Sequence, residues 1–289
     1  MKKLILVSFI LLSFIVSKAQ ESVLFKIKYL PNNLYESTIN TNMNMEMNFS
    51  GDSASLQKIK NKGIKLPMII SSVTNMIFSV KTGGIKNDKS YDIEIAYKDI
   101  DSKEIINDVQ KDSQVSPLKG ETIFGYYTAD GKMHVNSMSG GNINEQIKEQ
   151  LEGMLQNLIN QIKFPDQPMK IGDTFDQEVP FNLPLAGEGL NATIKIIYIL
   201  NKIENGKAFF DLDESMDLNL TKQKDSQTIN VTGNGIGKGN LIYDIKNSFA
   251  YKRNATLAMN YKMLIGTLTL TGKADIASST NTQLISLSK

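Results

Sequence analysis

Apolar and polar side chains alternate along most of the chain after residue 20. Within residues 41–49, Met43, Met45, Met47 and Phe49 are apolar, and the even positions between them are polar. A period of two places alternate side chains on opposite faces of a β-strand. Residues 91–98 repeat the pattern, and further strands are expected at 23–29, 73–82, 122–128, 132–137, 193–201, 207–220, 228–233, 240–247, 249–261, 262–276 and 282–287.

Three glycine-containing segments interrupt this alternation. Asp130-Gly131 and Asn205-Gly206 each separate two expected strands, and both dipeptides favour tight hairpin turns. Residues 233–239 carry glycine at every second position, but they lack the Gly-Lys-Ser/Thr ending of a phosphate-binding loop and precede a strand. We therefore expect a bend or a bulged strand there, with small residues where backbones approach.

A different period marks one long helix at residues 142–163. Asn142 and Glu145 resemble a capping box, and Pro165 disfavours helix in the residues before it. A second, shorter helix is expected near 53–61, with Ser53 as its cap. The long helix has an apolar stripe with spacings of three and four, formed by Ile143, Ile147, Leu151, Leu155, Leu158 and Ile162.

These elements predict a β-dominated α+β protein. Long antiparallel strands would curve into one or two half-barrel-like sheets, with the central amphipathic helix (about 142–163) as a lid or plug. The expected division is a β-rich half at 20–141, the helix at 142–165 and a second β-rich half at 166–289, together forming one continuous domain. Whether the two halves are a duplication is left open.

The first 19 residues have the pattern of a cleavable signal peptide. Lys2 and Lys3 precede an apolar run from Leu4 to Val16, and small residues stand at Ser17 and Ala19. The run is too short to span a bilayer, which takes about 20 apolar residues. The sequence therefore predicts export to the periplasm or the exterior, as a soluble protein.

The amino-acid composition excludes several kinds of anchor, cross-link and partner. The chain has no cysteine, which excludes a lipoprotein anchor and a disulfide framework. Loss of Lys2, Lys3 and Lys18 with the leader would lower the formal net charge of +2 by three. A nearly neutral chain without a basic cluster gives no footprint for nucleic acid, and no integral membrane span is expected after cleavage.

Few residues suggest catalysis. His134 is the one histidine, and without a flanking motif it is expected to be half-exposed rather than catalytic. Asp211, Asp213 and Asp217 share one strand face, which is typical of a solvated surface, whereas Glu214 falls on the apolar side. A strand edge or a misjudged register is the favoured explanation for this position of Glu214. We expect no catalytic residue, no metal site and no cofactor.

The methionine run has two interpretations. Thioethers bind Cu(I), and Met43, Met45 and Met47 have a spacing that a copper site can use. Methionine also fills irregular apolar space, and lining of a core or cavity is the favoured interpretation. Met43, Met45, Met47 and Phe49 are accordingly the predicted lining of an apolar cavity.

The function predicted from these features is non-enzymatic. The favoured hypothesis is binding of a lipid or other apolar small molecule, or of an envelope component. The alternatives are a structural or protein-interaction role with a filled core, and a carboxylate-based hydrolase using Glu214.

A Tyr-containing extended segment precedes the Met-alternating strand, and then come a Gly-Lys hairpin, the central helix, Pro165 and a Gly-Asp-Thr-Phe element at 172–175. This order of motifs resembles a family of exported bacterial proteins named domain of unknown function 6263. The resemblance implies no activity. Asp173 is expected to bond backbone amides ahead of it, and Phe175 to begin a strand. The Lys-rich leader ending in Ala-Gln is similar to those of Bacteroidetes secreted proteins.

Overall fold

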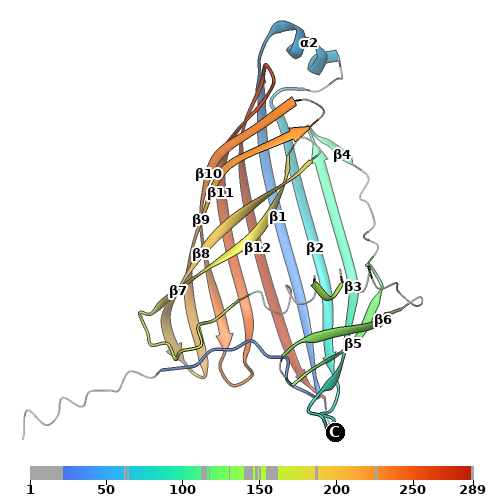
Figure 1. Cartoon of the computed structure of the whole chain (residues 1–289), viewed down its shortest axis with the longest axis vertical. Helices are drawn as coiled ribbons and strands as arrows, with labels where there is room; N and C mark the ends of the chain where they lie inside the picture. Colours follow the sequence, from blue (N-terminus) through green and yellow to red (C-terminus); the bar gives the residue numbers. More distant parts are fainter. Residues whose placement is uncertain are drawn as a thin grey trace, which may run out of the picture.

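One antiparallel sheet of 12 strands makes up most of the protein, and it is not closed into a barrel (Figure 1). The computed structural model describes residues 22–61, 63, 65–111, 116, 118–129, 131–139, 146, 149, 151–153, 162–185, 188–224 and 227–287. The strands lie in the order β6-β5-β3-β2-β1-β12-β11-β10-β9-β8-β7, with β4 paired to β3.

The strands are long, as the extended alternation predicts. They are β1 (Asn33–Ser50), β2 (Met68–Thr82), β3 (Tyr91–Ile106), β4 (Val109–Lys111), β5 (Thr122–Tyr127), β6 (Met133–Met138), β7 (Thr174–Leu185), β8 (Glu188–Glu204), β9 (Lys207–Lys224), β10 (Gln227–Asp244), β11 (Phe249–Ile265) and β12 (Leu268–Ser286).

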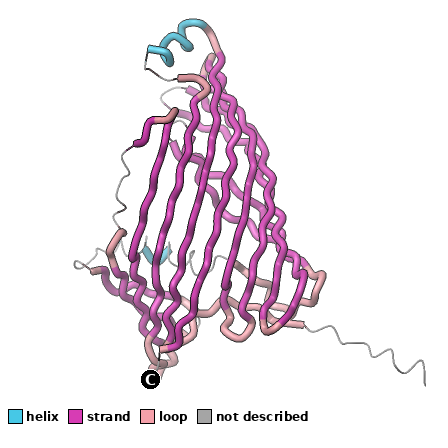
Figure 2. The backbone as a smooth tube through the Cα atoms, turned by 180° about the vertical axis from the view of Figure 1, so that it is seen from behind, coloured by secondary structure: helices cyan, strands magenta, loops and turns pink. Residues whose placement is uncertain are grey.

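The first and last strands join the two halves of the chain. β1 pairs with β12 along its whole length, from Asn33 opposite Ser286 to Ser50 opposite Thr269. The fold is therefore the expected β-dominated one, with a single open sheet rather than two. Its strands converge toward the end that carries the short helix α2 (Ser53–Asn61) and spread apart at the opposite, wide end (Figure 2).

The sheet curves so strongly that distant strands share a core. Met45 and Met47 of β1 belong to the same buried cluster as Met216 of β9 and Ala192 of β8, although three strands separate β1 from β9 and four separate it from β8 in the sheet order. In Figure 1, β8 accordingly crosses over β12 and β1. The concave surface is called the inner face below.

Glycines on β10 permit this curvature. A Cβ atom at Gly237 would lie 2.2 Å from the Thr256 carbonyl oxygen, and one at Gly239 would lie 2.4 Å from that of Asn254. Side chains cannot occupy such space, so the neighbouring backbone of β11 approaches where only glycine fits. The predicted close approach is confirmed. The strand is continuous, however, and its register irregularity lies between Ile242 and Tyr243.

Both predicted hairpin turns are confirmed. Asn205 and Gly206 have φ angles of 53° and 72° between β8 and β9, as a type I′ turn requires. Gly131 has a φ of 86°, and Thr128 and Lys132 are hydrogen-bonded across the turn between β5 and β6.

The short helix α2 occupies the predicted residues, but Ser53 does not cap it. The Ser55 amide donates instead to Oδ1 of Asp52, at 2.9 Å, and Thr267 of the β11–β12 turn donates to Oδ2 of the same carboxylate. A carboxylate is an acceptor for several donors at once, so Asp52 satisfies the helix start and ties it to a neighbouring turn.

Other strand boundaries differ from those expected. Residues 23–29 form no regular strand, and only Val23 makes an isolated bridge, to Met169. β11 continues to Ile265 because the turn is set by Gly266, whose φ is 58°.

Parts of two predictions lie outside the described residues. The leader, 1–19, is one of them. Most of the central helix, 142–163, is the other, although Gln146, Glu149 and Leu151–Gly153 are helical and Ile162 and Lys163 are not. Among the helices that the structure describes, none has both the length and the apolar character needed to cross a membrane.

Candidate functional site

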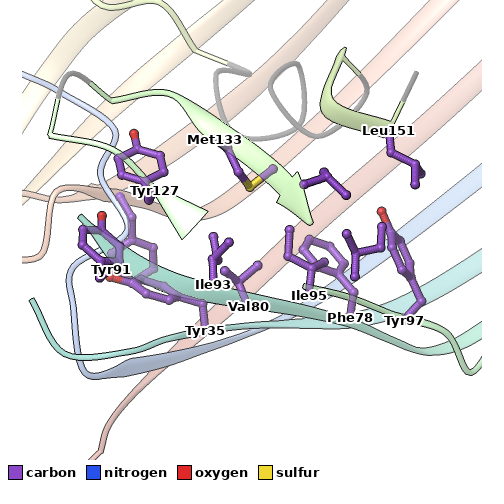
Figure 3. Packing of buried hydrophobic residues seen from close by; sticks show 13 residues of the cluster. Tyr35, Phe78, Val80, Tyr91, Ile93, Ile95, Tyr97, Tyr127, Met133 and Leu151 are labelled. Atoms are coloured by element: carbon purple, nitrogen blue, oxygen red, sulfur yellow. The ribbon is translucent and has the colours of Figure 1, made fainter. Parts of the chain in front are cut away.

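The inner face carries three clusters of buried apolar side chains. The first lies toward the β6 side of the wide end, the second near the converging end, and the third under β8, β9 and β10. Figure 3 shows the first cluster, in which Val80 and Ile93 point toward Met133 from the facing strands. Leu151 also reaches this cluster, and Oε1 of Glu152 accepts a hydrogen bond from the Val135 amide at 2.8 Å.

Two segments without regular secondary structure cross the wide end, and we call them the straps. The first strap is residues 22–30, which run across the wide end before β1 (Figure 1). The second strap is residues 162–169. Val23 and Met169 join the straps through two backbone hydrogen bonds of 2.9 and 2.8 Å.

Aromatic rings attach the straps to the sheet. Phe25 is 1% exposed, and its ring centroid lies 5.2 Å from those of Phe164, Phe210 and Tyr243. Tyr243 Oη also donates to the Lys26 carbonyl oxygen at 2.5 Å. The straps therefore complete the third cluster, and they cover the inner face at the wide end.

A cavity of about 60 Å³ lies between the straps and the sheet. Its lining is mainly aliphatic and aromatic, with three hydroxyl groups from Ser37, Thr280 and Thr282. Ser37 and Thr282 are hydrogen-bonded to each other at 2.9 Å. The remaining lining residues are Ile27, Tyr29, Tyr35, Ile39, Phe78, Ile162, Phe249 and Ala250.

The tyrosines in this wall are uncharged at neutral pH. Burial raises the pKa of Tyr35 to about 12, and it also raises the pKa of Tyr29. Tyr35 Oη accepts a hydrogen bond from the Leu30 amide at 2.7 Å, and Tyr91 Oη donates to the Tyr29 carbonyl oxygen at 2.5 Å. The hydroxyl groups of Tyr35 and Tyr91 are thus engaged with the first strap, and the rings of Tyr29 and Tyr35 present apolar surface to the cavity.

A buried ion pair lies beside this cavity. Glu214 of β9 is 6% exposed, and its Oε1 atom is 2.7 Å from Nη2 of Arg253 of β11. Burial raises the pKa of Glu214, and the Arg253 guanidinium opposes that shift. Glu214 therefore does face inward, so a misjudged register is not the explanation for its position.

The methionine run also faces inward, but away from the cavity. Met45 and Met47 are each 2% exposed in the second cluster, and Met43 and Phe49 pack against it. The lining of the cavity includes Ile39, which precedes Met43 on β1, and none of these four residues. The cluster contains three more buried methionines, Met216, Met259 and Met263.

The remaining candidate residues lie on the surface. Asp211, Asp213 and Asp217 are exposed on the outer face of β9, as predicted. His134 is half-exposed, stacks on Tyr126 and lies 3.8 Å from Glu152. In the described part of the chain, no three His, Cys, Asp or Glu side chains are grouped so that they could hold a metal.

The Gly-Asp-Thr-Phe element is a turn that starts β7. Gly172 has a φ of 95°, and Asp173 Oδ2 accepts from the Lys170 amide at 2.8 Å. The expectation that Asp173 bonds amides ahead of it is wrong, because the turn brings the preceding amide to its side chain. Phe175 stacks on Tyr198 at 4.5 Å, within the third cluster.

Arg253 is the residue that the sequence reasoning missed. It lies in an expected strand at a position two residues from Ala255 and four from Leu257, both buried. The same alternation that places Glu214 on the inner face therefore places Arg253 there as well. Because buried charges are usually paired, one inward-facing acid and one inward-facing base could have predicted this ion pair.

Comparisons with known proteins leave the chain without a family. No protein-family model matches it, and no curated protein matches its sequence. One similar solved structure is "Lipid-protein interactions in lipovitellin", with 9% identity and a TM-score of 0.46, covering 91% of this chain and 26% of that one. Another is OccK5 (OpdH) of Pseudomonas aeruginosa, with 7% identity and a TM-score of 0.26, covering 86% and 98%. At these scores neither likeness assigns a ligand or a fold family.

Proposed function

We propose that this chain is an exported, non-enzymatic protein that binds an apolar small molecule between the straps and the inner face. The cavity carries the proposal, because aliphatic and aromatic side chains surround it and a few hydroxyl groups interrupt its wall. Export as a soluble protein, to the periplasm or the exterior, is part of the proposal and rests on the leader. Membership in the family named domain of unknown function 6263 is a further part.

The volume of the cavity sets the size of the ligand. Pockets for drug-sized molecules hold roughly 300–1,000 Å³, whereas this cavity holds about 60 Å³. One water-sized sphere takes roughly 10–15 Å³, so the space accepts about four to six such spheres. A short aliphatic segment fits as the structure stands, and a longer chain requires the straps to move.

The second cluster would supply the additional room. Methionine is unbranched and polarisable, and it repacks around different shapes more readily than branched side chains do. Met43, Met45, Met47 and Phe49 are proposed as this deformable wall beyond the cavity, as part of one continuous inner face.

Native mass spectrometry after incubation with a bacterial lipid extract tests the proposal. We expect added mass on the wild-type protein. The added mass should decrease at least several-fold in Ile39→Phe, because Ile39 lines the cavity and a larger ring fills it. Ile39→Leu is the matched control, since it conserves volume and should retain the ligand.

A wild-type protein that carries no added mass overturns the proposal. That result supports the alternative, in which the core is filled and the protein has a structural or protein-interaction role. Equal binding by wild type and Ile39→Phe, with both proteins folded, would move the ligand away from this cavity and would also contradict the proposal.

A further inference from the structure

The chain has 32 basic Lys and Arg residues, and Arg253 is its only arginine. The lysines have compact, strongly hydrated charges that suit the surface, whereas a guanidinium is weakly hydrated and binds carboxylates in a planar, two-pronged geometry. Arg253 is 27% exposed in its side chain and lies on the inner face with Glu214. A single arginine in an apolar concavity requires an explanation.

The arginine reaches its partner across the glycine strand. Arg253 belongs to β11 and Glu214 to β9, with β10 between them. Gly237 lies directly opposite Glu214, and a Cβ atom there would approach the Glu214 Cβ atom to 3.2 Å. Because the glycines of β10 carry no side chains, the guanidinium can extend over this strand to reach Glu214.

Glu214 occupies only part of the guanidinium. A guanidinium has five N–H donors, and within the described part of the chain Arg253 donates one hydrogen bond, to Glu214. The fully buried side-chain polar atoms of the described residues all have partners, except for Tyr261 Oη. Nε and Nη1 of Arg253 have none, so they are not fully buried and face accessible space inside the curved sheet.

That space adjoins the cavity. Arg253 lies directly opposite Thr280 of β12, and Thr280 lies directly opposite Ile39 of β1. Directly opposed residues have Cβ atoms about 4.5–5.5 Å apart on one face of the sheet. Because Thr280 and Ile39 both line the cavity, the arginine is one residue beyond its wall.

We propose that Arg253 binds the carboxylate of a short aliphatic acid whose hydrocarbon chain occupies the cavity. The proposal deepens the proposed function, on which it rests, by naming the ligand class. Charge-assisted bonds from the free N–H groups would hold the carboxylate, and the apolar wall would hold the short aliphatic chain. Glu214 orients the guanidinium and competes with the ligand for it.

Isothermal titration with hexanoate and 1-hexanol tests this pairing. The two probes share the six-carbon chain and differ in the charged group. We expect the wild-type protein to bind hexanoate at least tenfold more tightly than 1-hexanol. Arg253→Gln should remove that preference while leaving the affinity for 1-hexanol unchanged.

Glu214→Gln provides the opposite test. Replacing the carboxylate removes the competitor and its repulsion of an incoming anion, so hexanoate should bind several-fold more tightly, again with no change for 1-hexanol. The double variant Glu214→Gln/Arg253→Gln leaves no unpaired charge inside the protein and should bind the two probes alike. It keeps the test valid if Arg253→Gln alone fails to fold.

The outcomes separate this inference from the proposed function. Binding of both probes with equal affinity by wild type, or equal losses of both in Arg253→Gln, overturns the role of Arg253 and leaves the apolar site standing. A protein that binds neither probe, nor any component of the lipid extract, overturns both. Binding of an extract component alone overturns the assignment to short acids.

Discussion

Tyr261 illustrates a cost that the core carries at a single atom. The residue is 4% exposed in the second cluster, and its hydroxyl group has no hydrogen-bond partner among the residues that the structure describes. Its ring fits against β12 only because position 272 is glycine, where a Cβ atom would lie 2.5 Å from the Tyr261 Oη atom. Burial without a partner disfavours a hydroxyl by about 1–3 kcal/mol.

Removing that hydroxyl should therefore do no harm. We expect Tyr261→Phe to leave the free energy of unfolding unchanged or to raise it by about 1 kcal/mol. Tyr35→Phe is the control, because Tyr35 Oη accepts a hydrogen bond from the Leu30 amide and its loss should cost about 1 kcal/mol. Urea denaturation of both variants measures the difference. A clear destabilisation by Tyr261→Phe would show that the hydroxyl is engaged.

For single residues, the sequence predicted which face of the sheet a side chain lies on, but it did not predict which residue that side chain contacts. Alternation predicted that Glu214 faces the apolar side and that Asp211, Asp213 and Asp217 face water, and both are observed. The ion pair was not predicted, because its two residues lie on strands that are separated by β10 and their meeting depends on the sheet order. Ser53 was the expected cap, whereas Asp52 caps the helix, because neighbouring polar residues are equivalent candidates until the backbone is placed.

Among the elements, β10 determines how the sheet bends. Its glycines lie on the inner face of the sheet, and at most of them atoms of β11 are too close to leave room for a side chain. The consequence differs along the strand: at Gly237 the obstacle is a backbone oxygen at 2.2 Å, whereas at Gly235 the nearest atom is the Met259 Cβ atom at 3.1 Å.

Substitution at these two glycines should separate their roles. We expect Gly237→Ala to lower the free energy of unfolding by about 2–3 kcal/mol, because the backbone of β11 has to move. Gly235→Ala should cost less than about 1 kcal/mol, since its neighbour gives way by a few tenths of an ångström. Denaturation midpoints of the two variants provide the comparison, and equal losses would contradict this account of the bend.

Elements with strong local signals were predictable, whereas those held by distant contacts were not. Asn205-Gly206 determines its own turn, since both residues adopt positive φ angles readily. Residues 23–29 alternate like a strand, but Phe25 packs into rings from the second strap and from β9 and β10. Those contacts, which no local pattern encodes, make the segment a strap.

At the scale of the whole molecule, the straps determine whether the wide end is open or covered. Phe25 is fixed by several aromatic rings, whereas its neighbour Leu24 is 46% exposed. We expect Phe25→Ala to lower the free energy of unfolding by about 3 kcal/mol, because a buried ring is lost and a void remains. Leu24→Ala should change it by less than about 0.5 kcal/mol.

Thermal and urea unfolding of these two variants test the role of the straps, and hydrogen exchange locates the effect. Amides of the first strap, including those of Val23 and Lys28, should lose protection in Phe25→Ala first. Retention of that protection, together with wild-type stability, would mean that the straps are held by other contacts.

The order of strands could not be predicted from the chain. Hairpins join most neighbours along the sequence, but the pairing of β1 with β12 unites residues that are more than 200 positions apart at every point. Long-range pairings of this kind depend on the completed fold rather than on local preference. The class of fold followed from alternation alone, and its single sheet followed from this one pairing.

The pairing of the first strand with the last also has a consequence for the timing of folding. Met45 and Met47 find their neighbours Ala274 and Gly272 only after nearly the whole chain has been synthesised. Until then β1 lacks a partner on one side, and the second cluster cannot assemble. The pairing of β12 with β1 and β11 is therefore the step that completes the sheet, and the protein reaches its final form only when this strand has formed.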